Sequence, residues 1–246
     1  YQISQIVDRT SINLNFDASV KGAEIESTWE PLPGLRFRFG GGYEDTSVNK
    51  GQSAVDLMDR TAGHSDWMVV KPGVTDTSNC VLPAYVMREI ISNKLASHSL
   101  TNLFVTAPCD VAYYNQGTFW GPDYSLAGSY GVTDFDPATA PNGGAGFSKD
   151  LGGNQLPNAP HFTTSLSAEY TMPVSGDWAA TLHTDFYWQS NSFARIFNDR
   201  PYDELRGYTN VNLALVVTGT DGWQVTGYLK NVFNTTAITG AFLNSD

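Results

Sequence analysis

Hydrophobic and polar residues alternate along two neighbouring segments between His161 and Gln189, and a short polar turn joins these segments. Because successive side chains of a β-strand point to opposite faces, the alternation predicts two strands with one apolar and one polar face each. Ser175, Gly176 and Asp177 are typical turn residues, so the strands are predicted to form a hairpin. The apolar positions are Phe162, Leu166, Ala168, Tyr170 and Met172 in the first strand, and Trp178, Ala180, Leu182, Phe186 and Trp188 in the second.

The same period of two predicts further strands along the chain. The apolar positions change phase near Gly22, which predicts a β-bulge there. About seven strands are expected in total, counting a partial first one. Besides the hairpin, they cover residues 1–7, Ile12–Trp29, Leu35–Tyr43, Tyr208–Thr218 and Trp223–Lys230.

The expected strands are long, and their connections alternate in length. Each arm of the hairpin has about ten residues or more, whereas strands of globular proteins usually have about five or six. Short turns at residues 31–34, 173–177 and 219–222 fall on one side of an up-and-down meander, and the long connections 45–160 and 190–207 fall on the other. This asymmetry of loop lengths is typical of outer-membrane barrels. Such barrels also have strands with one apolar and one polar face, and aromatic residues at the strand ends.

We therefore expect an all-β fold, an antiparallel up-and-down transmembrane β-barrel. Seven strands are too few to close a barrel and would leave unpaired edges in lipid, so the chain is expected to be part of a larger barrel. Aromatic belts mark the membrane interfaces of such proteins. The tryptophans expected in these belts are Trp29, Trp178, Trp188 and Trp223.

The long connection from Asp45 to Pro160 has no regular alternation. Structureless connections of this length are rare in compact domains, so we expect a folded excursion or a functional loop, placed on the extracellular side. Pro83–Ser97 has apolar residues at helical spacing and predicts a short helix. Cys80 and Cys109 flank this helix without metal-binding spacing, which favours a disulfide over two free thiols and indicates an oxidising compartment.

The net charge, the hydropathy and the chain ends narrow the possible classes of protein further. The net charge of −11 argues against nucleic acid as a partner, because phosphate binding needs a basic surface. No apolar run is long enough for a transmembrane helix. The chain starts in a strand-like run without Met or a signal peptide and stops in a polar stretch that should lead into another strand, so we expect it to begin inside a fold.

Four segments resemble the C-terminal part of TonB-dependent outer-membrane receptors. The motif KGAEIE before a strand and the motif LKNVFN after a tryptophan near the end are similar to those of the family in order and spacing. The resemblance covers the strands and not the 45–160 excursion. The segments are SVKGAEIESTWEPLPGLRFRFGGGYEDT, LPNAPHFTTSLSAEYTMPVSGDWAATLHTDFYW, GYTNVNLALVV and GWQVTGYLKNVFN.

The resemblance implies a bacterial outer-membrane barrel of about twenty-two strands that is filled by an N-terminal plug domain. In this family the plug engages TonB across the periplasm. A scarce small-molecule ligand, such as a ferric siderophore, cobalamin, haem or an oligosaccharide, is bound and imported. Lipid, TonB and the ligand are thus the implied partners, and no cofactor is implied. Because the sequence contains no plug, no TonB-coupling box and no final strand ending in an aromatic residue, this function concerns the parent protein.

Candidate ligand contacts are aromatic and arginine residues of the expected extracellular loops. Exposed aromatic residues form contact patches, and arginine binds anionic groups such as those of a ferric siderophore. The alternatives are packing inside a folded loop for the aromatic residues, and salt bridges with Asp199, Asp203 or Glu204 for the arginines. The candidates are Tyr113, Tyr114, Phe119, Trp120 and Tyr124, together with Arg195 and Arg200.

Three classes of function stay open from the sequence. Active transport by a plugged receptor is the first, passive permeation through a porin-like barrel is the second, and a soluble β-sandwich or lectin-like carbohydrate-binding module is the third. An enzyme is the least supported class, because the chain has no nucleophile-elbow, zinc-protease, phosphate-loop or paired-cysteine motif. His183 and Asp185 share a strand face but lack a third metal ligand, so no metal site is expected.

Overall fold

The computed structural model describes residues 1–7, 10–71, 79–97, 108–114, 125–219 and 222–241. These residues fall into two compact units. Unit 1 comprises residues 1–17 and 50–152, and unit 2 comprises residues 18–49 and 153–241. The expected interruption of the sheet by a separate excursion is therefore seen, although the strand before it continues to Val48 and residues 153–160 belong to the unit of the sheet.

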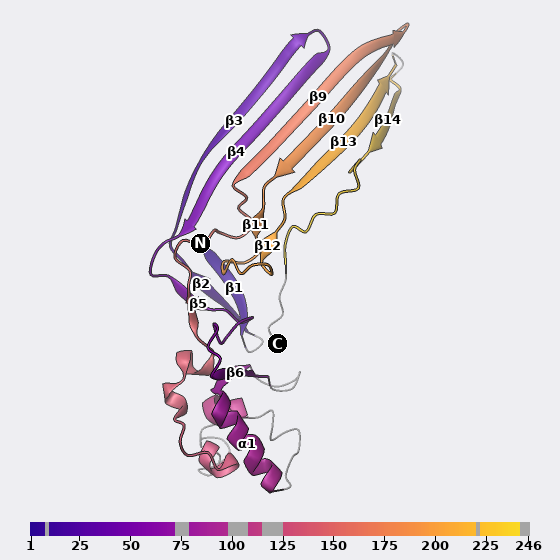
Figure 1. Ribbon diagram of the computed structural model, residues 1–246. Coiled ribbons are helices and arrows are strands. Elements are labelled where there is room, and N and C mark those ends of the chain that lie inside the picture. Colours follow the sequence, from indigo (N-terminus) through magenta and orange to yellow (C-terminus); the bar gives the residue numbers. More distant parts are fainter. Residues whose placement is uncertain (8–9, 72–78, 98–107, 115–124, 220–221, 242–246) are drawn as a thin grey trace. The chain divides into compact units, whose positions relative to one another are not determined.

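Six long strands form one antiparallel sheet in unit 2, and Figure 1 shows them side by side. Each strand pairs with the next one of the six along the chain, so the sheet is an up-and-down meander. The expected antiparallel, mostly β architecture is confirmed. The sheet is open rather than closed, and its strands are β3 (Ala18–Leu32), β4 (Leu35–Val48), β9 (Phe162–Ser175), β10 (Trp178–Gln189), β13 (Tyr208–Thr218) and β14 (Gln224–Leu229).

The pairing register gathers the apolar side chains on one face of this sheet. Leu182 of β10 pairs with Tyr170 of β9 and with Leu215 of β13, and the same order continues along the strands. Leu182 and Leu215 are 45% and 47% exposed, so neither is buried in a protein core. We call this the apolar face; it includes Ile25, Trp29, Phe37, Phe39, Tyr43, Phe162, Leu166, Tyr170, Met172, Leu182, Phe186, Trp188, Val211, Leu213, Leu215, Val217, Val225 and Leu229.

The opposite face of the sheet is polar and carries most of its charge. His183 lies between two carboxylates: its Nε2 is 3.0 Å from Asp185 and its Nδ1 is 3.7 Å from Glu169. Arg36 pairs with Glu169 in the strand register and forms an ion pair with Glu30. This polar face also includes Glu24, Glu26, Arg38, Ser165, Ser167, Thr171, Thr181, Asn210, Asn212 and Thr226.

The turn between β3 and β4 depends on Gly34. Its backbone has φ +82°, and a Cβ atom there would lie 2.4 Å from the carbonyl oxygen of Thr171. The Thr171 amide donates to the Gly34 carbonyl at 2.8 Å, so the turn is tied to the neighbouring strand β9. Only glycine adopts this conformation without strain and lets the two backbones approach so closely.

Two expectations about the N-terminal strands are wrong. The pairing of β3 with β4 runs without a shift from Ala18 to Trp29, so Gly22 is not in a bulge. Ala18 and Val20 instead lie on the polar face of the sheet, where their cross-strand partners Val48 and Thr46 are buried. Ile12, Leu14 and Phe16, which were expected in the same strand, precede β3 and do not belong to the large sheet.

The first residues also do not join the large sheet. β1 (Gln2–Val7) and β2 (Thr10–Asn15) pair with each other and form a separate hairpin in unit 1. Two backbone hydrogen bonds of 2.7 Å between Tyr1 and Phe16 close it. The large sheet thus has six strands rather than the seven expected.

Unit 1 has its own hydrophobic core. The predicted helix is present as α1 (Ala84–Ala96), and a disulfide joins Cys80 to Cys109, the pairing that the sequence favoured. The core consists of Val70, Cys80, Leu82, Val86, Met87, Ile90, Cys109, Val111, Ala112, Leu126, Tyr130 and Val132. The further elements are β5 (Ser53–Val55) paired with β8 (Ser148–Asp150), β6 (Trp67–Val70) paired with β7 (Cys80–Pro83), and the helical turns Asp110–Tyr114, Leu126–Tyr130, Pro137–Thr139 and Pro141–Gly144.

Polar side chains stabilise this unit at two places, the β5–β8 pair and the start of α1. Asp56 is fully buried and pairs with Lys149 at 3.3 Å, which links the strands β5 and β8 near their ends. At the helix, burial raises the pKa of Tyr85, and the carboxylates of Asp134 and Glu89 raise it further. The neutral hydroxyl of Tyr85 donates to the carbonyl of Asp134 at 3.3 Å.

Candidate functional site

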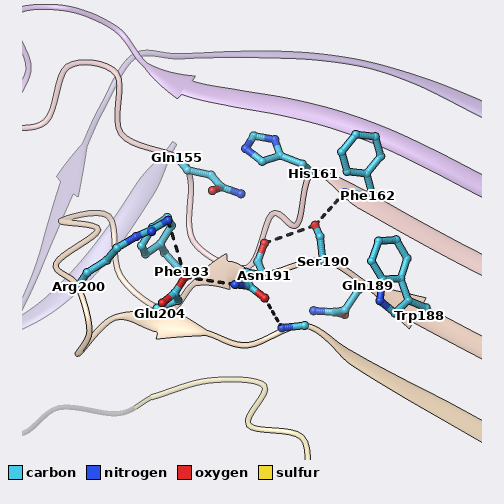
Figure 2. Close-up of a pocket in the computed structure, with 11 residues that line it drawn as sticks. Gln155, His161, Phe162, Trp188, Gln189, Ser190, Asn191, Phe193, Arg200 and Glu204 are labelled. Atoms are coloured by element: carbon cyan, nitrogen blue, oxygen red, sulfur yellow. Dashed lines mark hydrogen bonds and ion pairs between the residues drawn. The ribbon is translucent and has the colours of Figure 1, made fainter.

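A cavity of about 490 Å³ lies in unit 2, where the central strand β9 begins, its neighbour β10 ends and the 190–207 loop follows (Figure 2). Its wall combines aromatic rings from the strand ends with polar side chains from the loop. The lining residues are Gln155, His161, Phe162, Trp188, Gln189, Ser190, Asn191, Phe193, Arg200, Glu204 and Gly207.

The loop above the strands is held by a buried ion pair. Arg195 Nε donates to Asp203 Oδ1 at 2.6 Å, and the other Asp203 oxygen accepts from the Asp199 amide at 2.9 Å. Asp203 is 1% exposed, so its charge is compensated inside the protein. The short strands β11 (Ser192–Phe193) and β12 (Glu204–Leu205) pair on either side of this ion pair and present their flanking residues to the cavity.

A second tie connects the loop to the segment before β9. The side chain of Asn198 accepts from the Gln155 amide at 2.7 Å and donates to the carbonyl of Gln155 at 3.0 Å. Asn198 has φ +54°, a left-handed conformation that asparagine tolerates better than most residues. Because both backbone groups of Gln155 are used, residue 155 is fixed at the wall of the cavity.

The strand ends line the cavity from both faces of the sheet. Phe162 and Trp188 lie on the apolar face, whereas Gln189 pairs with Thr163 on the polar face. Ser190 joins the two strand ends, because its amide donates to the Phe162 carbonyl and its hydroxyl accepts from the Phe162 amide. The cavity therefore lies at the end of the sheet and touches both of its faces.

The loop side of the cavity is polar but nearly neutral. The guanidinium of Arg200 lies 5.4 Å from the ring centre of Phe193 and 3.7 Å from Glu204, and its side chain is 68% exposed. Glu204 also accepts from Asn191 at 3.2 Å, and Asn191 accepts from the Gly207 amide at 2.7 Å. Figure 2 shows these groups on the loop side, across the cavity from Phe162 and Trp188.

Such a wall can bind a molecule through rings and hydrogen bonds. Aromatic rings supply apolar contact, and the side chains around them supply both donors and acceptors. Within the described residues, no group of three or more His, Cys, Asp or Glu side chains could hold a metal ion. No helix in the same part of the chain has the length and apolar character needed to span a membrane.

The residues singled out in the sequence fall in different places. Arg200 lines the cavity, whereas Arg195 forms the internal ion pair with Asp203 that was its alternative interpretation. Both arginines belong to unit 2, and Tyr113 belongs to unit 1. Tyr113 donates to the Val81 carbonyl at 2.8 Å and packs against the core of that unit, as its alternative interpretation stated.

The other aromatic candidates cannot be placed. Tyr114 lies in a helical turn of unit 1, and its side chain is outside the described part of the structure. Phe119, Trp120 and Tyr124 lie outside the described residues altogether. These four stay predictions from the sequence.

Sequence reasoning did not predict most of the cavity wall. Phe162 was recognised only as a member of an alternating strand, and Trp188 was expected in an interfacial aromatic belt. His161, Asn191 and Phe193 were not singled out. Their position in the sequence could have indicated a site, because these residues lie at the strand ends beside the 190–207 loop. Gln155 gave no such signal, since its place follows from the hydrogen bonds to Asn198.

Comparisons of this chain with protein-family models, with curated proteins and with solved structures found no match.

Proposed function

We propose that this chain forms part of the barrel of a TonB-dependent outer-membrane transporter. The observation that carries the proposal is the two-faced sheet: six antiparallel strands expose a continuous apolar face, opposite a face of charged and hydroxyl side chains. A soluble protein normally covers such an apolar face with a second layer, because exposed apolar patches rarely exceed a few hundred Å². In a barrel wall, lipid would cover the apolar face and water would solvate the polar face.

The dimensions of the apolar face suit a bilayer. From Phe162 to Met172 the apolar positions of β9 extend over about 34 Å, at about 3.4 Å per residue. A strand tilted by about 40°, as barrel strands are, would cross about 26 Å with this stretch, close to the band of about 25 Å that outer-membrane barrels present to lipid.

Aromatic residues at both ends of the strands support the same proposal. Tyr43 and Phe162 contact each other where the long connections begin, with ring centres 5.1 Å apart. Trp29 stacks on Phe37 near the short turn between β3 and β4, with ring centres 5.7 Å apart. Aromatic rings prefer the two interfaces of a membrane, so these positions fit two belts.

The open edges add a requirement. Among the described residues, β3 and β14 each pair on one side only, and unpaired backbone groups are costly in hydrocarbon. The proposal therefore requires further strands beside β3 and β14. Among barrels of larger size, the resemblance to TonB-dependent receptors favours active uptake of a scarce ligand, with the loops at the long-connection end as the extracellular binding surface.

Fractionation of the full-length parent protein tests the proposal. We expect it in the outer membrane, soluble only with detergent, and retained by the purified periplasmic domain of TonB. A protein that is soluble without detergent would overturn the membrane assignment and favour a carbohydrate-binding module. A detergent-dependent barrel that does not bind TonB would overturn the transport mechanism and favour a passive porin.

A further inference from the structure

We propose that the side chains of Lys149 and Asp56 condense into an intramolecular amide bond inside unit 1. Asp56 directly follows β5, near the start of the long excursion, and Lys149 is the middle residue of β8, near its end. The inference goes beyond the proposed transport function and does not depend on it. It assigns a covalent modification that fastens β5 to β8.

The strand pairing brings the two side chains into contact. Lys149 Nζ lies 3.3 Å from Asp56 Oδ2, although 93 residues separate the two in the chain. Reactants that are held in contact form bonds far faster than the same groups free in solution, because the entropy of bringing them together has already been lost. The fold of unit 1 therefore supplies the proximity that a condensation without an enzyme needs.

The site keeps water away from both reacting groups. The side chain of Asp56 is completely buried, and that of Lys149 is 18% exposed. A buried ion pair costs free energy because both charges lose their hydration, whereas an amide carries no charge. A dry site also protects the amide from hydrolysis. Burial therefore favours the amide over the ion pair.

A second carboxylate and a backbone amide complete the site. Asp59 Oδ2 is 2.9 Å from Lys149 Nζ, and its side chain is 43% exposed, so it can take a proton from the amine while it stays in contact with water. The Met58 amide donates to Asp56 Oδ1 at 3.0 Å and stabilises the negative charge that develops on this oxygen during attack. An amine, a base and a hydrogen-bond donor thus surround the carboxyl group of Asp56.

The reaction balances without any further reactant. The Lys149 nitrogen attacks the carboxyl carbon of Asp56, and a C–N bond replaces the bond from that carbon to Oδ2. The ammonium has three protons; two of them pass through Asp59 to Oδ2, which leaves as water, and one stays on the amide nitrogen. The charges of the ammonium and the carboxylate cancel, so no oxidant or reductant takes part.

The bond gives a short pairing a permanent link. β5 and β8 have three residues each, so their backbone hydrogen bonds alone form a short ladder. A covalent link between residues far apart in the chain restricts the unfolded state, as a disulfide does. Unit 1 is then closed twice, by the amide at the β5–β8 pair and by the disulfide in its core.

Intact mass spectrometry of the purified full-length protein, denatured and with its disulfide reduced, tests this inference. We expect a mass one water below that of the sequence. Trypsin should leave residues 51–60, which contain Asp56, joined to a peptide that is not cut after Lys149. Lys149→Arg keeps the positive charge but lacks the primary amine, so this variant should show its full mass.

A second variant tests the role of the base. Asp59→Asn should slow formation of the bond about a hundredfold or more, measured as the linked fraction against time after synthesis. The matched control is Asp150→Asn, which changes the carboxylate that accepts from the Gly152 amide. Because successive side chains of a strand point to opposite faces, this change beside Lys149 should leave the rate the same.

Three results would overturn the proposal. A natural protein at its full sequence mass would show that Lys149 and Asp56 stay an ion pair. A link that peptide fragmentation places at Asp59 would overturn the choice of Asp56 as the group attacked. A loss of water that persists in Lys149→Arg would have to arise elsewhere in the chain. The mass of the natural protein decides the first point whether or not a variant folds, and fractionation tests the membrane location separately.

Discussion

The two units of this chain place their apolar residues in opposite ways. In unit 1, Val86, Ile90 and Leu82 are completely buried around a disulfide. In unit 2, the apolar side chains of six strands lie on one uncovered face, with Ile25 and Val225 each 60% exposed. Unit 1 therefore buries its apolar residues in an internal core, whereas the sheet of unit 2 leaves an apolar face exposed among the described residues.

The difference shows that hydrophobic content alone does not determine where apolar residues lie. Both units contain many apolar residues, but only the sheet places most of them on one face of its strands, with a period of two. In unit 1 the apolar residues follow helix and turn geometry and converge on a common interior. Perturbations that act on one unit and spare the other test whether the two are stabilised by different means.

Removal of the disulfide should have the largest effect, and it should be confined to unit 1. The bond closes a loop of 29 residues, for which the chain-entropy relation gives about 3.6 kcal/mol. The double variant Cys80→Ala, Cys109→Ala should lower the opening free energy of α1 amides by about this amount and leave β10 amides unchanged, as measured by hydrogen exchange. The single Cys80→Ala variant is the control and should lose as much as the double variant. Equal losses in β10 would show that the two units unfold together.

A charge placed on the sheet should distinguish its two faces. Leu215 and Ala214 are adjacent in β13, and the strand register places them on the apolar and polar faces. Leu215→Arg should lower the free energy of unfolding in lipid vesicles by about 2–4 kcal/mol, because arginine near the bilayer midplane is costly. Ala214→Arg should have little effect, since its cross-strand partner His183 is flanked by Asp185 and Glu169. Equal tolerance of both changes in a denaturant titration would contradict a lipid-facing surface.

The long strands could be predicted because their side-chain pattern is regular and local. The alternation from Phe162 to Met172 predicts which face each side chain of this part of β9 occupies, and the structure confirms it. The partner of a strand is not encoded in the same way. The alternation of residues 1–16 suits any antiparallel neighbour, and the structure pairs β1 with β2 instead of adding β1 to the sheet.

The cavity could not be predicted because it depends on contacts between distant segments. Arg200 was singled out for its charge, but its neighbours His161 and Trp188 become its neighbours only after β9 and β10 pair. Gln155 joins them through Asn198, 43 residues away in the chain. Such contacts depend on loop conformation, which the period of the flanking strands does not determine.

The smallest predicted effect concerns the short turn between β3 and β4. Gly34→Ala should cost about 1–3 kcal/mol, because a left-handed φ of +82° is strained for alanine and the new Cβ would meet the Thr171 carbonyl at 2.4 Å. Gly227→Ala is the matched control: it lies in β14 without a positive φ, and nothing lies within 4 Å of its added Cβ, so stability should stay nearly constant. Denaturant unfolding in vesicles measures both, and hydrogen exchange locates the loss. If Gly34→Ala weakened α1 of unit 1 as much as β3 and β4, the sheet and the disulfide-linked core would have to share one unfolding transition, and the separation between them drawn from their opposite burial patterns would be wrong.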